Sequence, residues 1–107
     1  MATPLPRVHT VLRSLHSRLP KGVDDLAYRV DIEANGDECL VVHIATERED
    51  TFNESRKRSV ERQIRDALAA NLSWSVYFRW RTTEEAKAER QVVTNDGLLD
   101  RLHSVLP

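Results

Sequence analysis

Four histidines and one cysteine are the residues of this 107-residue chain whose side chains most readily bind metals. His9 and His16 lie seven residues apart on a predicted helix, which separates them by about 10 Å along its axis. Cys39 and His43 lie four residues apart on a predicted strand, about 13 Å along it. Because metal ligands lie within about 2.3 Å of the ion, the sequence predicts no metal site and no cofactor.

The patterns typical of phosphate binding and nucleophilic catalysis are also missing. The glycines at positions 22, 36 and 97 are isolated, whereas a phosphate-binding loop needs them clustered. No serine lies in a G-x-S-x-G turn, and Cys39 lies inside a predicted strand instead of at an electropositive helix terminus. We therefore expect no enzymatic activity.

The composition is that of a single globular domain: 40% of residues are hydrophobic and 31% are charged. The chain has sixteen basic and seventeen acidic residues, and the resulting net charge of -1 argues against a strongly basic nucleic-acid binder. One cysteine excludes an internal disulfide, which favours a reducing compartment. No apolar run approaches the roughly 18 residues of a membrane span. We expect a soluble cytoplasmic protein.

Apolar residues at helical spacing predict a first helix at about residues 7–19, ended by Pro20 and Gly22. Strict alternation from Tyr28 to Ala34 predicts a strand, and Asn35-Gly36 predicts a type I′ hairpin turn that Asp37 could lengthen. The second arm of the hairpin spans residues 38–46.

The second half of the chain predicts a helix, a strand and further helical segments. Thr51 and Glu54 fit a capping box at the start of the helix. Alternation over residues 73–82 predicts a third strand, and Thr82 with Glu85 fits a second capping box. An amphipathic helical segment is expected to follow Gly97.

These elements predict an α+β fold: one small domain over residues 1–107, with αββαβ(α) order. A β-helix-β crossover makes the third strand parallel to the second, which gives a three-stranded mixed sheet. The second helix is expected to pack on one sheet face, over Leu40, Val42, Ile44, Trp74, Val76, Phe78 and Trp80.

The opposite sheet face carries the candidate partner-binding residues. Tyr77, Arg79 and Arg81 share this face with Val41 and His43, and tyrosine and arginine are enriched in the cores of protein interfaces. We expect this surface to bind a protein partner or a second copy of the chain. In the alternative, the first helix or the C-terminal segment covers the face within the monomer.

The second helix suggests a different function, RNA binding by an accessory protein. Arg58, Arg62 and Arg65 form one stripe that could face phosphates, together with the arginines of the third strand. However, three opposite-charge pairs at i, i+4 spacing are expected to neutralise this stripe: Glu54 with Arg58, Glu61 with Arg65, and Arg62 with Asp66.

The alternating segments over residues 26–85 resemble a set of small uncharacterised bacterial proteins, some of them encoded beside HEPN-type proteins of the toxin–antitoxin kind. The resemblance is carried by Tyr28-Arg29-Val30-x-Ile32, Val41-Val42-His43-Ile44, Ala67-Leu68 and Trp74-x-Val76-Tyr77-Phe78-Arg79-Trp80-Arg81-Thr82. It implies an interaction partner more than a reaction, with this chain in an antitoxin-like role. The element order is also similar to the scaffold domain of NifU-type iron–sulfur proteins, but the C-x-x-C motif of that family is absent, so cluster assembly is not implied.

Overall fold

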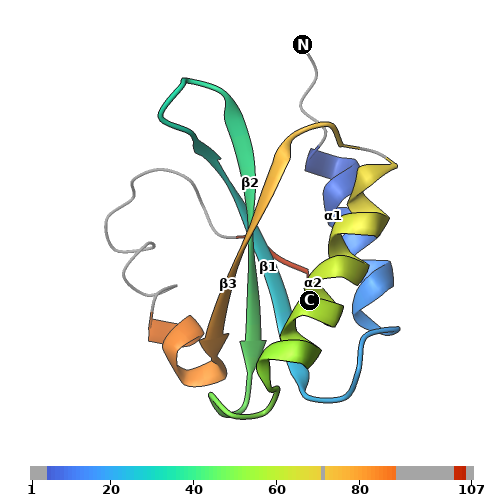
Figure 1. The fold of residues 1–107 in the computed structure, drawn as a ribbon, viewed down its shortest axis with the longest axis vertical. Helices are drawn as coiled ribbons and strands as arrows, with labels where there is room; N and C mark the ends of the chain where they lie inside the picture. Colours follow the sequence, from blue (N-terminus) through green and yellow to red (C-terminus); the bar gives the residue numbers. More distant parts are fainter. Residues whose placement is uncertain (1–4, 71, 89–102, 106–107) are drawn as a thin grey trace.

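A computed structural model describes residues 5–70, 72–88 and 103–105 (Figure 1). In chain order the elements are α1 (Leu5–His16), β1 (Val23–Ile32), β2 (Glu38–Thr46), α2 (Glu54–Ala69), β3 (Ser75–Thr82) and β4 (His103–Ser104). Residues 83–88 form a further short helix. The predicted α+β class is confirmed. No helix in these described stretches is long and apolar enough to cross a lipid bilayer.

The strands form one mixed sheet in the order β3-β2-β1-β4. As predicted, β1 and β2 pair antiparallel as a hairpin, and β3 lies parallel to β2 after the α2 crossover. The short β4 pairs antiparallel with β1 and adds a fourth strand at that edge, beside Ala27 and Tyr28. Residues 103–104 are therefore extended, where the sequence predicted a helical segment, and residues 97–102 of that segment lie outside the described residues.

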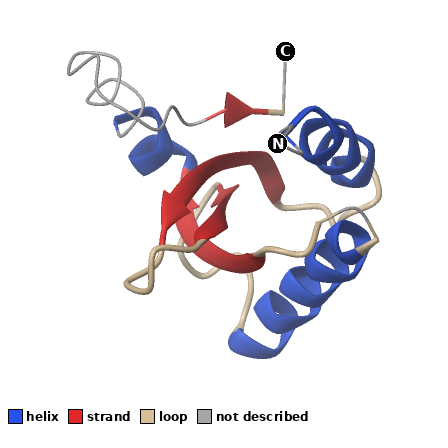
Figure 2. Ribbon diagram, turned by 90° about the horizontal axis from the view of Figure 1, so that it is seen from above, coloured by secondary structure: helices blue, strands red, loops and turns tan. Residues whose placement is uncertain are grey.

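Helices α1 and α2 lie together on one side of the curved sheet, and the helix of residues 83–88 lies apart from them (Figure 2). The main core fills the space between these two helices and the sheet. Alternate residues of β2 enter this core, and α2 contributes Val60, Ile64 and Leu68. The β3 residues predicted beneath α2 pack against this core and are partly buried: Val76, Phe78 and Trp80, with Trp74 just before the strand. The predicted packing of this helix is confirmed.

Strand β2 is buried on both faces. From Cys39 to Thr46 every residue is buried, and Glu38 is exposed. Leu40, Val42 and Ile44 have no exposed surface on the helix side, and the intervening residues are covered on the other side. A strand buried in this way reads as a nearly continuous apolar run, as Cys-Leu-Val-Val-His-Ile-Ala does here.

The first half of the chain differs from the prediction at the element ends. Helix α1 runs from Leu5 to His16, and the chain then turns through backbone bonds from Arg18 N to Leu15 O (2.8 Å) and from Leu19 N to His16 O (3.3 Å). Strand β1 begins at Val23, five residues before the predicted start at Tyr28. The prediction missed these residues because a bulge between Val23 and Asp25 interrupts the alternation that marks a strand.

The hairpin is confirmed, but its connection is longer than a two-residue type I′ turn. Glu33 accepts a bond from Gly36 N (2.8 Å), and Glu33 N donates to Asp37 O (2.8 Å). Gly36 adopts a φ of 91°, which suits a three-residue connection with glycine in the left-handed region.

The start of α2 corrects the predicted capping box. Asn53 caps the helix: its side-chain oxygen accepts a bond from Arg56 N at 2.8 Å. Thr51 instead bonds within its loop, where its hydroxyl donates to Arg48 O at 2.9 Å. The second predicted capping box is confirmed, since Thr82 and Glu85 each bond the other's backbone N–H at 3.1 Å.

We predict that Asn53→Ala lowers the free energy of unfolding by about 1 kcal/mol, because a helix N–H loses its acceptor. Urea unfolding followed by circular dichroism measures this difference. Ser55→Ala, at an exposed position in the first turn of α2, is the control and should change stability much less. Equal effects of the two substitutions would contradict the assignment of the cap.

Candidate functional site

The five predicted partner-binding residues lie on one face of the sheet, turned away from α1 and α2, which we call the distal face. The parallel register places Val41 beside Tyr77, His43 beside Arg79, and Ala45 beside Arg81. Because successive side chains of a strand alternate between faces, all five lie opposite the main core. The pattern thus predicted their common face correctly.

Exposure divides these residues into a rim and a floor. Tyr77 is 50% exposed and Arg79 is exposed, whereas Arg81 is half-buried. Val41 and His43 are only 5% and 8% exposed. A partner approaching this face would therefore meet Tyr77 and Arg79 first, and the direct contacts predicted for Val41 and His43 would require their cover to move.

The structure tests part of the predicted alternative, in which a terminal segment covers the distal face. Helix α1 packs with α2 on the other side, so it does not cover this face (Figure 2). Strand β4 adds to β1, which is two strands away from β3. The chain between the helix of residues 83–88 and β4 lies outside the described residues.

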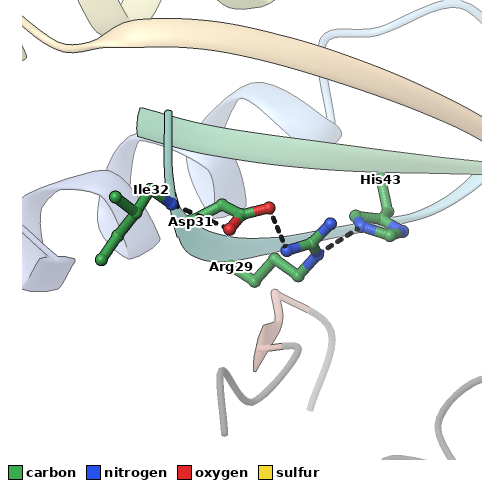
Figure 3. A network of polar contacts seen from close by, with 4 residues as sticks. All are labelled: Arg29, Asp31, Ile32 and His43. Atoms are coloured by element: carbon green, nitrogen blue, oxygen red, sulfur yellow. Dashed lines mark hydrogen bonds and ion pairs between the residues drawn. The ribbon is translucent and has the colours of Figure 1, made fainter. Parts of the chain in front are cut away.

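A polar network crosses the distal face from β1 to β2 (Figure 3). Arg29 forms an ion pair with Asp31, with 2.9 Å between Nη1 and Oδ2, and its Nε–H donates to His43 Nε2 at 3.4 Å. The backbone N–H of Ile32 donates to Asp31 Oδ1 at 2.8 Å. This backbone bond and the Arg29 guanidinium lower the pKa of the Asp31 carboxyl. Arg29 is thus held above His43, on the floor of the face.

Tyr77 is held by the hairpin. Its hydroxyl donates to Glu33 Oε1 at 2.8 Å, across 44 residues of sequence. This bond and the negative charge of Glu33 raise the pKa of Tyr77 above its ordinary value. The bond fixes the position of the exposed ring, so part of the entropy cost of ordering it on binding is already met.

An open pocket of about 720 Å³ joins these groups. Two arginines, Arg29 and Arg79, and two carboxylates, Asp31 and Glu33, line it, with Cys39 and Tyr77 among the remaining lining residues. The two guanidinium groups are balanced by two carboxylates, so this lining suits polar and charged protein side chains better than a bare phosphate.

Cys39 does not have the properties of a reactive thiol. It is 4% exposed, and burial raises the pKa of its thiol, with Asp31 and Glu33 acting in the same direction. A thiol with a raised pKa is mostly protonated near neutral pH and is a poor nucleophile and a poor metal ligand.

The described histidines lie apart from one another. His9 Nδ1 lies 2.9 Å from the Tyr28 hydroxyl, and His16 Nε2 lies 3.2 Å from the backbone oxygen of Val23. Within the described residues no three potential metal ligands gather. The absence of a metal and of catalysis in the protein stays a prediction.

The arginine stripe of α2 is arranged differently from the prediction. Arg65 lies over Phe78, with its Cζ 5.1 Å from the ring centroid, and Glu61 accepts a bond from Trp80 Nε1 at 2.7 Å. The ion pair recorded within residues 54–69 joins Lys57 to Glu54 at 3.9 Å. The three predicted i, i+4 pairs are not formed there. Arg58 and Arg62 remain exposed on the outer surface of the helix.

Sequence reasoning missed Arg29, Asp31 and Glu33. The Arg29-x-Asp31 spacing is a usable signal, because residues two apart on a strand share a face and their charges are opposite. The bond between Glu33 and Tyr77 depends on the β2 to β3 register and on the exact length of the hairpin connection, so it had no local signal.

Comparison with known proteins finds no matching family model, no curated relative and no similar solved structure. The resemblance to the HEPN-associated proteins stays a prediction. The site is therefore interpreted from its own geometry.

We predict that Glu33→Gln lowers the pKa of Tyr77 toward its ordinary value of 10.0, because the acceptor loses its negative charge. NMR titration of protein labelled at the tyrosine Cζ measures this pKa. Tyr28, which is bonded to His9, is the internal control and should titrate unchanged.

The sign of the pH dependence follows from the raised pKa. Because the pKa of Tyr77 is raised in the folded state, the protonated hydroxyl stabilises the protein at pH values below the ordinary pKa of 10.0. This stabilisation is lost as the pH rises through the raised pKa of the folded state. An unchanged Tyr77 titration in the variant would show that the bond to Glu33 does not form in solution.

Proposed function

We propose that this protein is a non-enzymatic interaction module, a small accessory subunit whose distal face contacts a protein partner through Tyr77 and Arg79. The observation that carries this proposal is the exposed ring of Tyr77, which its bond to Glu33 holds on β3, an edge strand of the sheet. Among the described residues it is one of two large hydrophobic side chains that are exposed, the other being Ile32 in the hairpin.

The chemistry around Tyr77 supports this proposal. A tyrosine offers a rigid apolar ring with a polar tip, and an adjacent guanidinium group can bind a carboxylate through two parallel hydrogen bonds. Both residue types dominate the energetics of protein interfaces. Val41 beneath them is apolar and the pocket rim is charged, which resembles the apolar centre and polar rim of an interface.

The proposed setting is the bacterial cytoplasm, as the single buried thiol and the family resemblance suggest. The antitoxin-like role implied by that resemblance is one form of such a module, in which the partner is the product of a neighbouring gene.

The test is the double variant Tyr77→Ala/Arg79→Ala. We predict that it weakens association by about 1–4 kcal/mol and leaves the melting temperature nearly unchanged, because both side chains are exposed. Tagged protein is isolated from its native cells, and the co-isolated protein and RNA are both identified. The control variant, Arg7→Ala/Arg13→Ala, also removes two exposed side chains, both on α1 on the other side of the sheet, and should retain the partner.

Two results would contradict the proposal. Retention of the partner by the double variant would place the interface elsewhere, with α2 as the next surface to test. Unfolding of the double variant would show that the distal face belongs to the core of the monomer.

The outer surface of α2 favours RNA binding as a second candidate function, because Arg58 and Arg62 are exposed there and no ion pair within residues 54–69 neutralises them. We predict that Arg58→Ala/Arg62→Ala makes the negative slope of log affinity against log salt less steep by about 1.4 for a single-stranded RNA. Fluorescence anisotropy with a labelled oligouridine at about 50 to 200 mM salt measures this slope.

Arg7→Ala/Arg13→Ala is the control for this experiment, since both residues are exposed on α1. It should leave the slope unchanged. Absence of RNA binding by the unaltered protein at the lowest salt would reject this candidate function.

A further inference from the structure

The outer edge of β3 presents backbone groups that pair with no described strand. β3 ends the sheet order, and its eight residues include Tyr77, Phe78 and Trp80. An edge strand of this length and composition readily pairs with another chain unless charges, prolines or bulges prevent it. Arg79 and Arg81 are the only charged side chains of the strand, and it contains no proline.

Two contacts identify which residues of β3 point their backbone groups outward. Arg65 of α2 donates from Nη2 to Val76 O at 3.3 Å, and Thr82 N donates to Glu85 Oε1 at 3.1 Å. The N–H and C=O of one strand residue point the same way, and successive residues alternate. The even-numbered residues therefore face away from β2. Phe78 and Trp80, between these two contacts, present the open part of the edge.

Charge complementarity then selects one way for two copies of this edge to pair. Two-fold antiparallel pairing centred on Arg79 would place two guanidinium groups directly opposite each other, which is destabilising. Centring on Trp80 would oppose Arg79 and Arg81. Centring on Tyr77 avoids like charges but aligns only residues 75–79.

Centring on Phe78 aligns residues 75–81 with no opposed like charges. It places Tyr77 of each copy opposite Arg79 of the other on the distal face, twice per dimer, and Arg81 opposite Ser75. Val76 then lies opposite Trp80 on the core side. A tyrosine ring beside a guanidinium group is a favourable cross-strand pair.

We propose that the partner of this edge is a second copy of the chain, joined β3 to β3 in antiparallel orientation with Phe78 on the two-fold axis. This inference rests on the proposed function and names its partner. Such an interface is isologous, because each chain contributes the same tyrosine and the same arginine. The outward backbone groups of Phe78 bond those of its copy, and the sheets of the two chains become continuous.

Disulfide trapping tests this register. In the proposed dimer Tyr77 and Arg79 of the two chains form a non-hydrogen-bonded pair, with Cα atoms about 4.5 Å apart, a separation that a disulfide spans. Chains carrying Tyr77→Cys and chains carrying Arg79→Cys, both with Cys39→Ala, are mixed and oxidised. We expect the mixed disulfide to exceed both homodisulfides by at least about tenfold, because like positions lie about 7 to 8 Å apart.

A mixture of Tyr77→Cys with Arg81→Cys is the matched control, since those positions pair only in the register centred on Arg79. Predominance of that control disulfide, or of either homodisulfide, would overturn the proposed register. The unaltered protein supplies a measurement independent of these variants. In an equal mixture of isotope-labelled and unlabelled chains, an intermolecular nuclear Overhauser effect should join Tyr77 Hα to Arg79 Hα.

Sedimentation equilibrium of the unaltered protein separates this inference from the function on which it rests. A monomer at NMR concentrations, or a dimer that dissociates on nuclease treatment, would overturn the β3 to β3 dimer. If a different protein is still co-isolated and is lost in Tyr77→Ala/Arg79→Ala, the interaction module stands and only its partner is changed. If the variant keeps both the co-isolated partner and the dimer, the proposed function itself is rejected.

Discussion

The fold depends on the burial of β2 on both of its faces. Eight consecutive residues from Cys39 to Thr46 are buried, so the chain must supply strands at both edges and cover on both sides. Antiparallel β1 and parallel β3 satisfy the edges, and α1 with α2 covers one face. On the other face, long side chains from β1 and β3 flank the shorter residues of β2. Arg29 is held there by Asp31 and His43, and Tyr77 is held by Glu33.

The main elements and their faces could be predicted because residues 28–34 and β3 alternate, β2 is an apolar run beside the hairpin turn, and the crossover helix fixes the relative direction of β2 and β3. The same local signals misplaced the start of β1, where a bulge after Val23 breaks the alternation. They also chose Thr51 as a cap, because a threonine three residues before a glutamate satisfies the pattern. In the structure Asn53 lies immediately before the helix and takes that role. Strand β4 could not be foreseen, since two residues carry no periodicity and their pairing with β1 spans most of the chain.

The sequence was enough to predict which residues of the candidate site share a face of the sheet, but not which of them are exposed. Alternation placed Tyr77, Arg79, Arg81, Val41 and His43 together. The exposed fraction of each depends on neighbours across strands, which a single sequence does not specify. His43 is buried beneath Arg29, and Tyr77 remains exposed at the edge while its hydroxyl bonds Glu33. The expected pair of Glu61 with Arg65 was replaced by contacts with the aromatic residues of β3, because Phe78 and Trp80 lie within reach of the helix.

The parallel crossover also has a consequence for the order in which the chain is made. The hairpin of β1 and β2 is complete when Thr46 leaves the ribosome, but the strand that pairs with the other edge of β2 begins only at Ser75. At about 5–20 residues per second, synthesis leaves the most apolar strand of the protein with an unpaired edge for a few seconds. The segment made in that interval contains α2, in which eight of sixteen residues are charged, so the chain that follows the open edge of β2 is polar.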